Sequence, residues 1–351
     1  MKIAIIGANE FQNKLVKKAK NLGIETHVFA WDEGAIAKES SDYFYPLSIT
    51  EKDKILEICK KIKIDGICSI GSDLAVLTVN YIAKELNLVG NTLNSTLFST
   101  NKYEMRKKMS KDGLPCPKFL LLENFERKFI EGQEISYPVI VKPTQLGGKR
   151  GITVANNEDE LRKAVKYAQE AIGQREQKII VEEFLNGGNE YSVEGLSFGG
   201  KHYIIQVTEK ISSGAPHCVE LGHRQPANIS SEMRKRIEKV LTGVFDRLQL
   251  KNGASHTEIK IIDNRIYLIE INFRPGGDHI ASPLTELSTG YSYIGGAIDI
   301  ALGCFEKPHI EQNKQKYAGV LFVTKQTKKY EKFFNGYENE EWMYKINHVS
   351  E

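Results

Sequence analysis

The sequence predicts an α/β protein that begins with a doubly wound parallel sheet. Three short apolar runs, over residues 3–6, 25–30 and 66–70, alternate with helical patterns through residue 95. Strands that alternate with helices of ten or more residues form parallel sheets with helical crossovers. A chain of 351 residues is too long for one hydrophobic core, so we expect two or three structural units.

Helical spacing of apolar residues predicts helices over 13–21, 51–63 and 73–86 in this first unit. The turn after the first strand holds one glycine, Gly7, where a dinucleotide-binding turn needs three, which disfavours an NAD site. The loop after the third strand ends in Asp73, at the sheet edge where open α/β sheets bind ligands. Asp73 either binds a substrate amine or caps the following helix, and capping is favoured by sequence alone.

Composition excludes several classes of protein. Hydrophobic residues make up 41% and charged residues 26%, which is typical of soluble globular chains. A net charge of +3 without a long basic run argues against nucleic acid as a partner. Five scattered cysteines without a CxxC pair argue for a reducing compartment and against zinc. No apolar run approaches the ~20 residues of a membrane span, and the chain opens directly into a strand. We therefore expect a cytoplasmic protein without a membrane partner.

The order of the expected elements changes near Thr100. A charged helix over 101–110 is followed by strands and helices that no longer alternate regularly. The strand over 138–142 ends in Lys142 and leads into a basic, glycine-rich loop over 145–151. The further expected elements are strands over 152–155 and 179–185, a strand carrying Glu190, an irregular loop over 208–226, and helices over 158–172, 231–248 and 290–303.

The most informative segment is the hairpin predicted over residues 258–272. Apolar, β-branched residues surround a turn at Asp263-Asn264, and alternation places Glu270 and Asn272 on one face. Pairing of the two strands sets Glu258 opposite Glu270 or Asn272. Like charges across a sheet are destabilising, so a cation is expected between them, and such oxygen ligands suit Mg2+ or Mn2+. The alternative is an ordinary hairpin with charged outer faces.

Arg274, Gly276 and Gly277 follow the hairpin directly and favour the metal interpretation. Arg274 shares the face of Asn272 if the strand runs that far, and a guanidinium holds phosphoryl or carboxylate oxygens bidentately. Gly276 and Gly277 allow a close backbone approach. Together these residues describe a phosphate-handling centre.

The glycine-rich loop can grip a polyphosphate, because glycines let backbone N–H groups approach phosphate oxygens. Lys142 and Lys149 would neutralise charge there. The loop is not a Walker loop, and taken alone it fits a mobile surface hairpin better. The strand over 182–185 has the character of a hinge whose backbone pairs with an adenine edge, and Glu190 can accept from ribose hydroxyls.

In combination, these features resemble the signature of the ATP-grasp superfamily. The resemblance rests on Lys102, Lys142, Gly147, Gly148, Lys149, Glu182, Glu183, Phe184, Leu185, Glu190, Glu258, Glu270, Asn272 and Arg274. It implies an α/β fold in which a Rossmann-like parallel sheet domain, residues 1–98, precedes a two-subdomain ATP-grasp domain, 99–304. The lid subdomain would span about 118–190, and 305–351 would form a short C-terminal extension.

The resemblance also implies ligands. Lys102 and Lys142 would contact ATP phosphates, the hinge would bind adenine through the backbone of Glu183 and Leu185, and Glu190 would bind ribose. Glu258, Glu270 and Asn272 would hold Mg2+ or Mn2+, as two ions. Arg274 would stabilise the phosphorylated intermediate.

Within the superfamily, the segments 256–260 and 274–278 look most like L-amino-acid ligases that make dipeptides, which are relatives of biotin carboxylase and carbamoyl-phosphate synthetase. That subgroup has an acid and a histidine near the substrate amino group, matching Glu220 and His223, with Asp73 in the same pocket. Alternatively, His223 is a structural loop histidine.

The expected activity is that of an ATP-dependent ligase, which activates an amino-acid carboxylate as an acyl phosphate for attack by an amine. Its partners would be small molecules, and a homodimer is compatible. Residues 317–351 suggest a truncated subdomain, with part of the acceptor pocket missing or supplied by a partner chain. The alternatives are a ligase of purine, carbamoyl or biotin-carboxylase type and a nucleotide-binding module without turnover.

Overall fold

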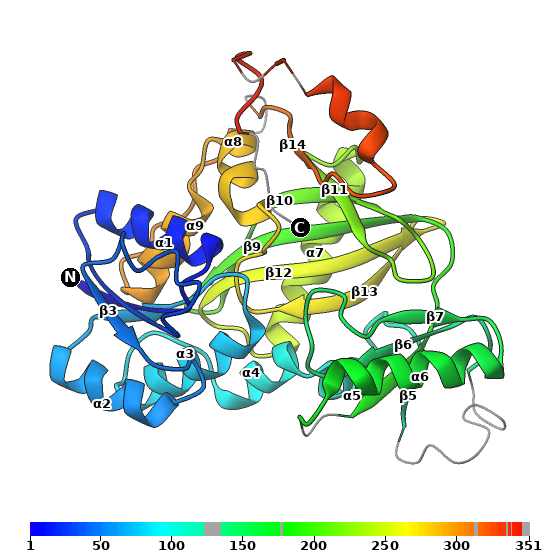
Figure 1. Cartoon of the computed structure of the whole chain (residues 1–351), viewed down its shortest axis with the longest axis horizontal. Coiled ribbons are helices and arrows are strands. Elements are labelled where there is room, and N and C mark those ends of the chain that lie inside the picture. Colours follow the sequence, from blue (N-terminus) through cyan, green and yellow to red (C-terminus); the bar gives the residue numbers. More distant parts are fainter. Residues whose placement is uncertain (123–134, 176–177, 312–314, 335, 338, 346–351) are drawn as a thin grey trace.

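The computed structural model contains three β-sheets that follow one another across the molecule (Figure 1). It describes residues 1–122, 135–175, 178–311, 315–334, 336–337 and 339–345. One sheet is parallel and lies at the N-terminal end, and the two others are antiparallel. The predicted α/β fold class, with a parallel sheet at the N-terminal end, is confirmed.

The parallel sheet has the strand order β3-β2-β1-β4. Its elements are β1 (Lys2–Ile6), α1 (Glu10–Asn21), β2 (Glu25–Ala30), β3 (Tyr43–Pro46), α2 (Lys52–Ile62), β4 (Gly66–Cys68) and α3 (Asp73–Glu85). Helix α1 begins three residues earlier than predicted, because Asn9 and Gln12 form a capping box. Strand β3 was not predicted; it is a short edge strand of aromatic residues that is only partly buried.

Two short helices connect this sheet to the rest of the chain. These are α4 (Leu93–Thr100) and α5 (Lys102–Lys111), and the side chain of Asn101 caps α5 by accepting from Tyr103 and Glu104. Lys102 is therefore the first residue of a helix. The division into units at residues 98 and 304 stays a proposal, and the parts of it over 123–134 and 346–351 lie outside the described residues.

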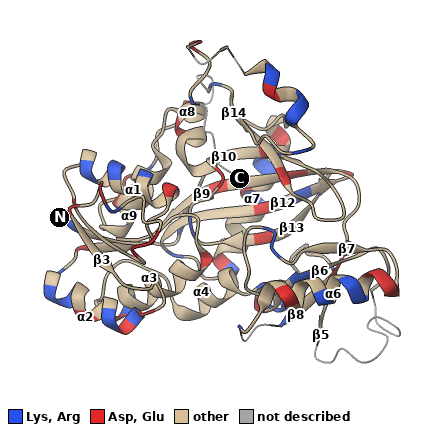
Figure 2. Cartoon of the chain, in the orientation of Figure 1, with Lys and Arg blue, Asp and Glu red and all other residues tan. Residues whose placement is uncertain are grey.

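The smaller antiparallel sheet carries the glycine-rich loop. Its order is β5 (Phe119–Leu122), β8 (Ile179–Glu183), β6 (Val139–Pro143) and β7 (Thr153–Ala155). Helix α6 (Glu158–Ile172) covers one face and buries Leu161, Val165 and Ala168 against the strands. Its outer side carries charges of both signs (Figure 2). The loop between β6 and β7 projects from this sheet toward the larger one (Figure 1).

The larger antiparallel sheet has six strands, in the order β13-β12-β9-β10-β11-β14. They are β9 (Asn189–Phe198), β10 (Lys201–Ser212), β11 (Glu220–Gln225), β12 (Gly253–Ile262), β13 (Arg265–Asn272) and β14 (Ala318–Leu321). The expectation of an irregular loop over 208–226 is wrong: β10 and β11 pair there, with Lys210 opposite His223. The polar residues of these strands obscured the alternation, and only the segment between them, with Gly214 and Pro216, is irregular.

Helices cover both sides of the six-stranded sheet. Helix α7 (Ser231–Arg247), capped by Ser230, buries Ile237, Leu241 and Phe245 on one side. The other side meets a π-helical turn (Ile280–Leu284), α8 (Thr285–Thr289) and α9 (Tyr293–Ala301), and a 3-10 helix (Lys328–Phe333) follows later. Helix α9 belongs to one core with the parallel sheet and β9, which fixes the two sheets to each other. Among the described residues, none of the helices has the length and apolar character needed to span a membrane.

Candidate active site

The hairpin acids face each other as predicted. Strands β12 and β13 pair antiparallel, with Glu258 directly opposite Glu270 and His256 opposite Asn272. A bulge after Glu258 leaves Ile269 out of the pairing. Two like charges in this position need compensation by cations.

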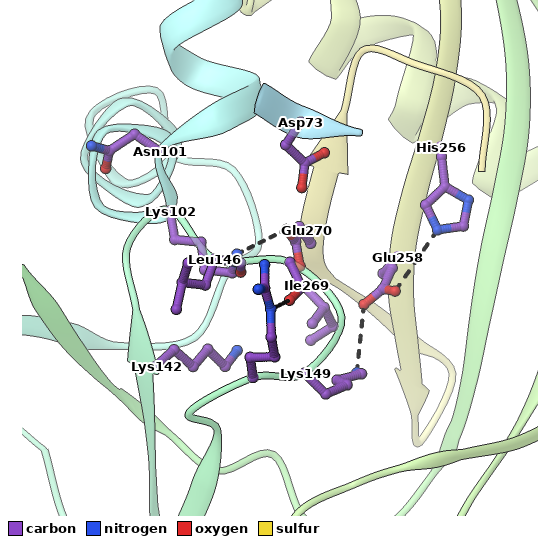
Figure 3. Close-up of polar contacts among 12 residues, drawn as sticks. Asp73, Asn101, Lys102, Lys142, Leu146, Lys149, His256, Glu258, Ile269 and Glu270 are labelled. Carbon is purple, nitrogen blue, oxygen red and sulfur yellow. Dashed lines mark hydrogen bonds and ion pairs between the residues drawn. The ribbon is translucent and has the colours of Figure 1, made fainter. Parts of the chain in front are cut away.

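Lysines provide that compensation in the structure. Lys102, at the start of α5, places its Nζ 3.0 Å from Glu270 Oε1. Lys210 of β10 hydrogen-bonds Glu258, and Lys149 of the glycine-rich loop lies 3.9 Å from Glu258 Oε2. Figure 3 shows Lys149 and His256 approaching Glu258 from opposite sides. Burial alone would raise the pKa of Glu258, but Lys210 and Lys149 hold it well below its ordinary value.

The donor set at the hairpin fits a hard divalent cation. Asn272 is 3% exposed, and its Oδ1 accepts no hydrogen bond from the described residues. Such a buried oxygen without a partner is costly unless a ligand satisfies it. Among the described residues no three His, Cys, Asp or Glu side chains gather as a metal group. Two carboxylates and an amide oxygen suit Mg2+, which takes its other ligands from water and phosphate.

Arg274 and Asp73 form an ion pair between the parallel sheet and the hairpin. Arg274 Nε donates to Asp73 Oδ1 at 2.5 Å. Burial opposes the charge of Asp73, but Arg274 lowers the pKa of this carboxyl below its ordinary value. The interpretation of Asp73 as the helix cap is wrong, because Ser72 accepts from the backbone of Ala75 and caps α3 instead. The side chain of Asp73 pairs with the guanidinium of Arg274 instead, and its role in binding a substrate amine stays a prediction.

The glycine-rich loop lies over these charged groups. Lys102 Nζ donates to the carbonyl of Leu146 at 3.0 Å, which ties the loop to α5. A Cβ added to Gly147 would lie 3.1 Å from Asp73 Oδ2, so the backbone approaches the acid closely there. Gly148 (φ 67°) and Lys149 (φ 57°) adopt the left-handed conformation, which costs a lysine more than a glycine.

Lys142 and the hinge form a separate buried ionic group. Lys142 Nζ lies 2.6 Å from Glu182 Oε2, and Arg106 Nε lies 2.8 Å from Glu182 Oε1. Burial raises the pKa of Glu182, but Arg106 and Lys142 outweigh it and lower the value to about 2. The side chain of Glu182 is therefore committed to two cations, and its backbone lies between Phe119 of β5 and Ile140 of β6 in the sheet.

The rest of the hinge lies beside Lys260 of β12. Lys260 Nζ donates to the carbonyl of Leu185 at 2.7 Å, lies 3.6 Å from Glu190 Oε1, and sits 5.5 Å from the centre of the Phe184 ring. Glu183 is the last residue of β8. Its N–H donates to the carbonyl of Lys118, just before β5, at 2.9 Å. Glu190 and the hinge, separated in sequence by a glycine turn, thus meet through one lysine.

Glu220 and His223 lie on β11 and point toward the same charges. Glu220 Oε1 is 2.9 Å from Lys210 Nζ and 3.4 Å from Lys149 Nζ. The ring of His223 is 1% exposed, packs edge-on against Phe322 at 5.6 Å, and has no hydrogen-bond partner among the described residues. Burial, reinforced by the charge of Lys210, lowers the pKa of His223 to about 4, so the ring is neutral near pH 7.

Gly276 and Gly277 occupy crowded backbone positions behind Arg274. A Cβ on Gly276 would lie 2.7 Å from His256 Nδ1, too close for any other residue without rearrangement. Gly277 lies against Phe11 of α1, and the N–H of Gly71 donates to Pro275 O at 3.2 Å. The segment that contains Gly276 and Gly277 therefore fits between β12 and the carboxyl edge of the parallel sheet.

Several charged residues of this region were not predicted. Arg106 is fully buried and also donates to Ile269 O, while His256 Nδ1 contacts Glu194 Oε1 at 2.8 Å. Burial lowers the pKa of His256, but Glu194 more than reverses this and raises it to about 9. Lys210 was missed because its segment was expected to be irregular. A strand over 201–212 would have set it beside Glu220 and Glu258.

The protein is thus an α/β protein in which two facing acids of a hairpin lie beside a glycine-rich loop that is tied to α5. Residues 135–282 match the family model described as ATP-grasp domain. Over these residues the chain matches an ATP-grasp domain, and the match covers less than half of its length.

Known proteins are similar to this chain in sequence and in fold. The chain is 26% identical over 239 residues to the carbamoyl phosphate synthase large chain of Thermotoga neapolitana, a match that covers 66% of this chain and 21% of that one. It thus spans about a fifth of that relative's length. The crystal structure of an L-amino acid ligase from Bacillus licheniformis superposes with a TM-score of 0.80 and 25% identity, over 92% of this chain and 80% of that chain.

A third comparison bears on the fold only. The biotin carboxylase domain of 2-oxoglutarate carboxylase from Hydrogenobacter thermophilus, solved as a dimer with MgADP and bicarbonate, superposes with a TM-score of 0.75. Its identity is 19%, over 91% of this chain and 73% of that chain.

Proposed function

We propose that the protein is an ATP-dependent carboxylate–amine ligase that acts on an amino acid and releases ADP and phosphate. The observation that carries this proposal is the meeting of Arg274 and Asp73 beside the opposed acids Glu258 and Glu270. A guanidinium next to oxygen ligands for a divalent cation can hold a phosphoryl group in transfer. The similarity to an L-amino acid ligase supports the choice of substrate class.

The nucleotide would lie between the two antiparallel sheets. The backbone of the hinge, residues 182–185, would bind adenine, and Glu190 would accept from the ribose. Lys142 and Lys102, with the backbone of Gly147 and Gly148 and the side chain of Lys149, would hold the phosphates. Lys142 and Lys102 are already paired with carboxylates in the structure, at 2.6 Å and 3.0 Å, so phosphate oxygens would share or replace those partners.

Glu258, Glu270 and Asn272 would hold Mg2+ or Mn2+. When bound, the cation supplies charge neutralisation between the phosphates and the developing negative charge. The orphaned Oδ1 of Asn272 and the facing carboxylates support this assignment.

In the first step, an oxygen of the substrate carboxylate attacks the γ-phosphorus of ATP, the bond to the β-phosphate oxygen breaks, and ADP leaves. Arg274, oriented by Asp73, would neutralise the acyl phosphate, and the backbone of Gly276 and Gly277 would position its acyl carbon. A neutral amine then attacks this carbon, loses a proton, and expels phosphate. The product is an amide, or a dipeptide if the amine is an amino acid.

Recognition of the first substrate's amino group would fall to Glu220 and His223. Glu220 is an acid held ionised, because Lys210 and Lys149 outweigh burial and lower its pKa. His223 is neutral, so one ring nitrogen donates and the other accepts. Both nitrogens lack a partner among the described residues, which supports a ligand in that place.

A phosphate-release screen tests the proposal. The protein is mixed with ATP, Mg2+ and pairs of amino acids, and phosphate is measured with each acid alone and with each pair. Release stimulated by one acid and increased by a second amine is expected. Measurable ATP binding without release from any carboxylate would overturn the ligase assignment in favour of a nucleotide-binding module.

A further inference from the structure

Four charged side chains form one cluster beside the hairpin. Lys210 hydrogen-bonds Glu258, and its Nζ lies 2.9 Å from Glu220 Oε1. Lys149 Nζ lies 3.4 Å from Glu220 Oε1 and 3.9 Å from Glu258 Oε2. Two ammonium groups and two carboxylates sum to zero formal charge, and His256, whose Nε2 lies 3.8 Å from Glu258 Oε1, is itself paired with Glu194. The cluster is therefore already neutral, although each of its acids is assigned to receive a cation.

The two lysines are attached to the protein in different ways. Lys210 lies within β10, which is hydrogen-bonded to β9 and β11, and its side chain is 4% exposed. Moving it would take the nearest cation away from two buried carboxylates, which is strongly unfavourable. Lys210 is therefore fixed.

Lys149 lies at a position from which its side chain can move away from Glu220 and Glu258. It lies in the loop between β6 and β7, its side chain is 26% exposed, and its contacts are longer than those of Lys210. Gly148 and Gly151 on either side allow the loop to change its backbone angles. Lys149 itself is held in the left-handed region (φ 57°), which is unfavourable for a side chain with a Cβ, so the observed loop depends on contacts such as these ion pairs.

We propose that Lys210 is the permanent counter-ion that positions Glu220 and Glu258, whereas Lys149 is an exchangeable one. Its ammonium leaves the two carboxylates when nucleotide phosphates attract it, and they then accept a metal ion and a substrate ammonium group. This inference rests on the proposed function, because it takes the phosphates to lie under the glycine-rich loop.

A consequence is positive coupling between nucleotide and cations. Without nucleotide, a metal ion must displace Lys149 from Glu258, which weakens its binding. With nucleotide, Lys149 has a new partner and the acid is available. Such coupling is reciprocal, so metal binding also tightens nucleotide binding.

The first test measures Mn2+ binding to the nucleotide-free protein by the electron paramagnetic resonance signal of free Mn2+. Lys149→Met should bind Mn2+ about tenfold more tightly than the wild type, because a competing charge about 4 Å from the acid is gone. Arg150→Met is the matched control: Arg150 is in the same loop, is exposed, and donates to Gly147 O rather than to an acid. Its Mn2+ affinity should stay within about twofold of the wild type, since exposed charges are screened.

Unchanged affinity in Lys149→Met would overturn the proposal, and so would equal tightening in Arg150→Met, which would show only a general charge effect. Neither measurement uses turnover or nucleotide. If no carboxylate supports turnover, the proposed function fails, and this comparison still decides the role of Lys149.

The second test concerns Lys210 and asks whether its removal strengthens or weakens Mn2+ binding. Removal of a cation should by itself tighten Mn2+ binding. Loss of a residue that positions Glu258 should weaken it instead, so we expect Lys210→Met to bind Mn2+ about tenfold more weakly than the wild type. Lys210→Arg keeps the charge and should restore binding to within about threefold of the wild type. Tighter binding in Lys210→Met would overturn the positioning role, and if that variant fails to fold, loss of binding in Lys210→Arg would do the same.

Discussion

Arg274 Nε donates to Asp73 Oδ1 across 201 residues of sequence, and this contact joins the loop after β13 to the first turn of α3. A second link, from Gly71 N to Pro275 O, runs parallel to it. The edge of the parallel sheet thereby sets the direction of the guanidinium. The N-terminal sheet is part of the site rather than a separate support.

Replacement of Asp73 by Asn should reduce turnover by about a hundredfold, because misplacement of a group near the reacting atoms has effects of this size. Steady-state kinetics measure the change. Asp53→Asn serves as the control, since Asp53 lies in α2 and accepts from Tyr81 at the surface. Equal activity of Asp73→Asn and wild type would show that Arg274 does not need this partner.

Glu270→Gln should abolish most turnover, by a factor of about a hundred or more, while circular dichroism and the melting temperature stay close to those of the wild type. The amide keeps the shape of the side chain but loses the charge that faces Glu258. Glu209→Gln is the matched change on β10, where the acid is paired with Arg224 instead. If Glu270→Gln retains full turnover, the assignment of the metal to the hairpin is wrong.

Arg106→Met should destabilise the fold by about 3 kcal/mol in urea unfolding, because it removes one partner of a buried charge. Arg106 contacts Glu182, Ile269 and Met109, and Lys142 alone cannot replace all of these contacts. Arg162→Met, which breaks an exposed pair with Glu158 one turn away, should cost less than about 1 kcal/mol. Equal losses in the two variants would contradict the buried network at the hinge.

His223 should give the fold an acid-sensitive stability. Its pKa is about 4 in the folded protein and 6.5 ordinarily, so the unfolded chain binds more protons between these values. Stability should therefore fall as pH drops from about 6.5 to about 4, by roughly 3 kcal/mol from this group.

Urea unfolding at several pH values measures this dependence. His223→Asn should flatten it between pH 6.5 and pH 4. His309→Asn, which changes an exposed histidine, should leave the curve unchanged. A wild-type curve that His223→Asn does not alter would show that the ring is charged or exposed in solution.

The hairpin could be predicted in detail because alternation and turn chemistry are local properties. Glu258 and Glu270 face each other as expected, and Asp263-Asn264 forms the turn with positive φ at both residues. The lysines that compensate the acids come from three elements distant in sequence, so the pattern of the hairpin itself does not identify them. Which cation meets which acid depends on tertiary packing.

The substrate side was predicted less well, for a physical reason. Lys210 and His223 lie in strands whose site-facing residues are polar, so the period of apolar residues that marks a strand is weak there. The choice between cap and ligand for Asp73 also needed the structure, because both roles use the same residue type at the start of a helix.

The proposed activity requires that a carboxylate becomes an acyl phosphate in this site. Hydroxylamine tests it most directly, because it traps acyl phosphates as hydroxamates and needs no acceptor pocket. The protein is incubated with ATP, Mg2+, hydroxylamine and each amino acid in turn, and hydroxamate and ADP are measured together. We predict equal amounts of hydroxamate and ADP with at least one amino acid, and neither product with Glu270→Gln. ATP binding without hydroxamate from any carboxylate would contradict the formation of an acyl phosphate.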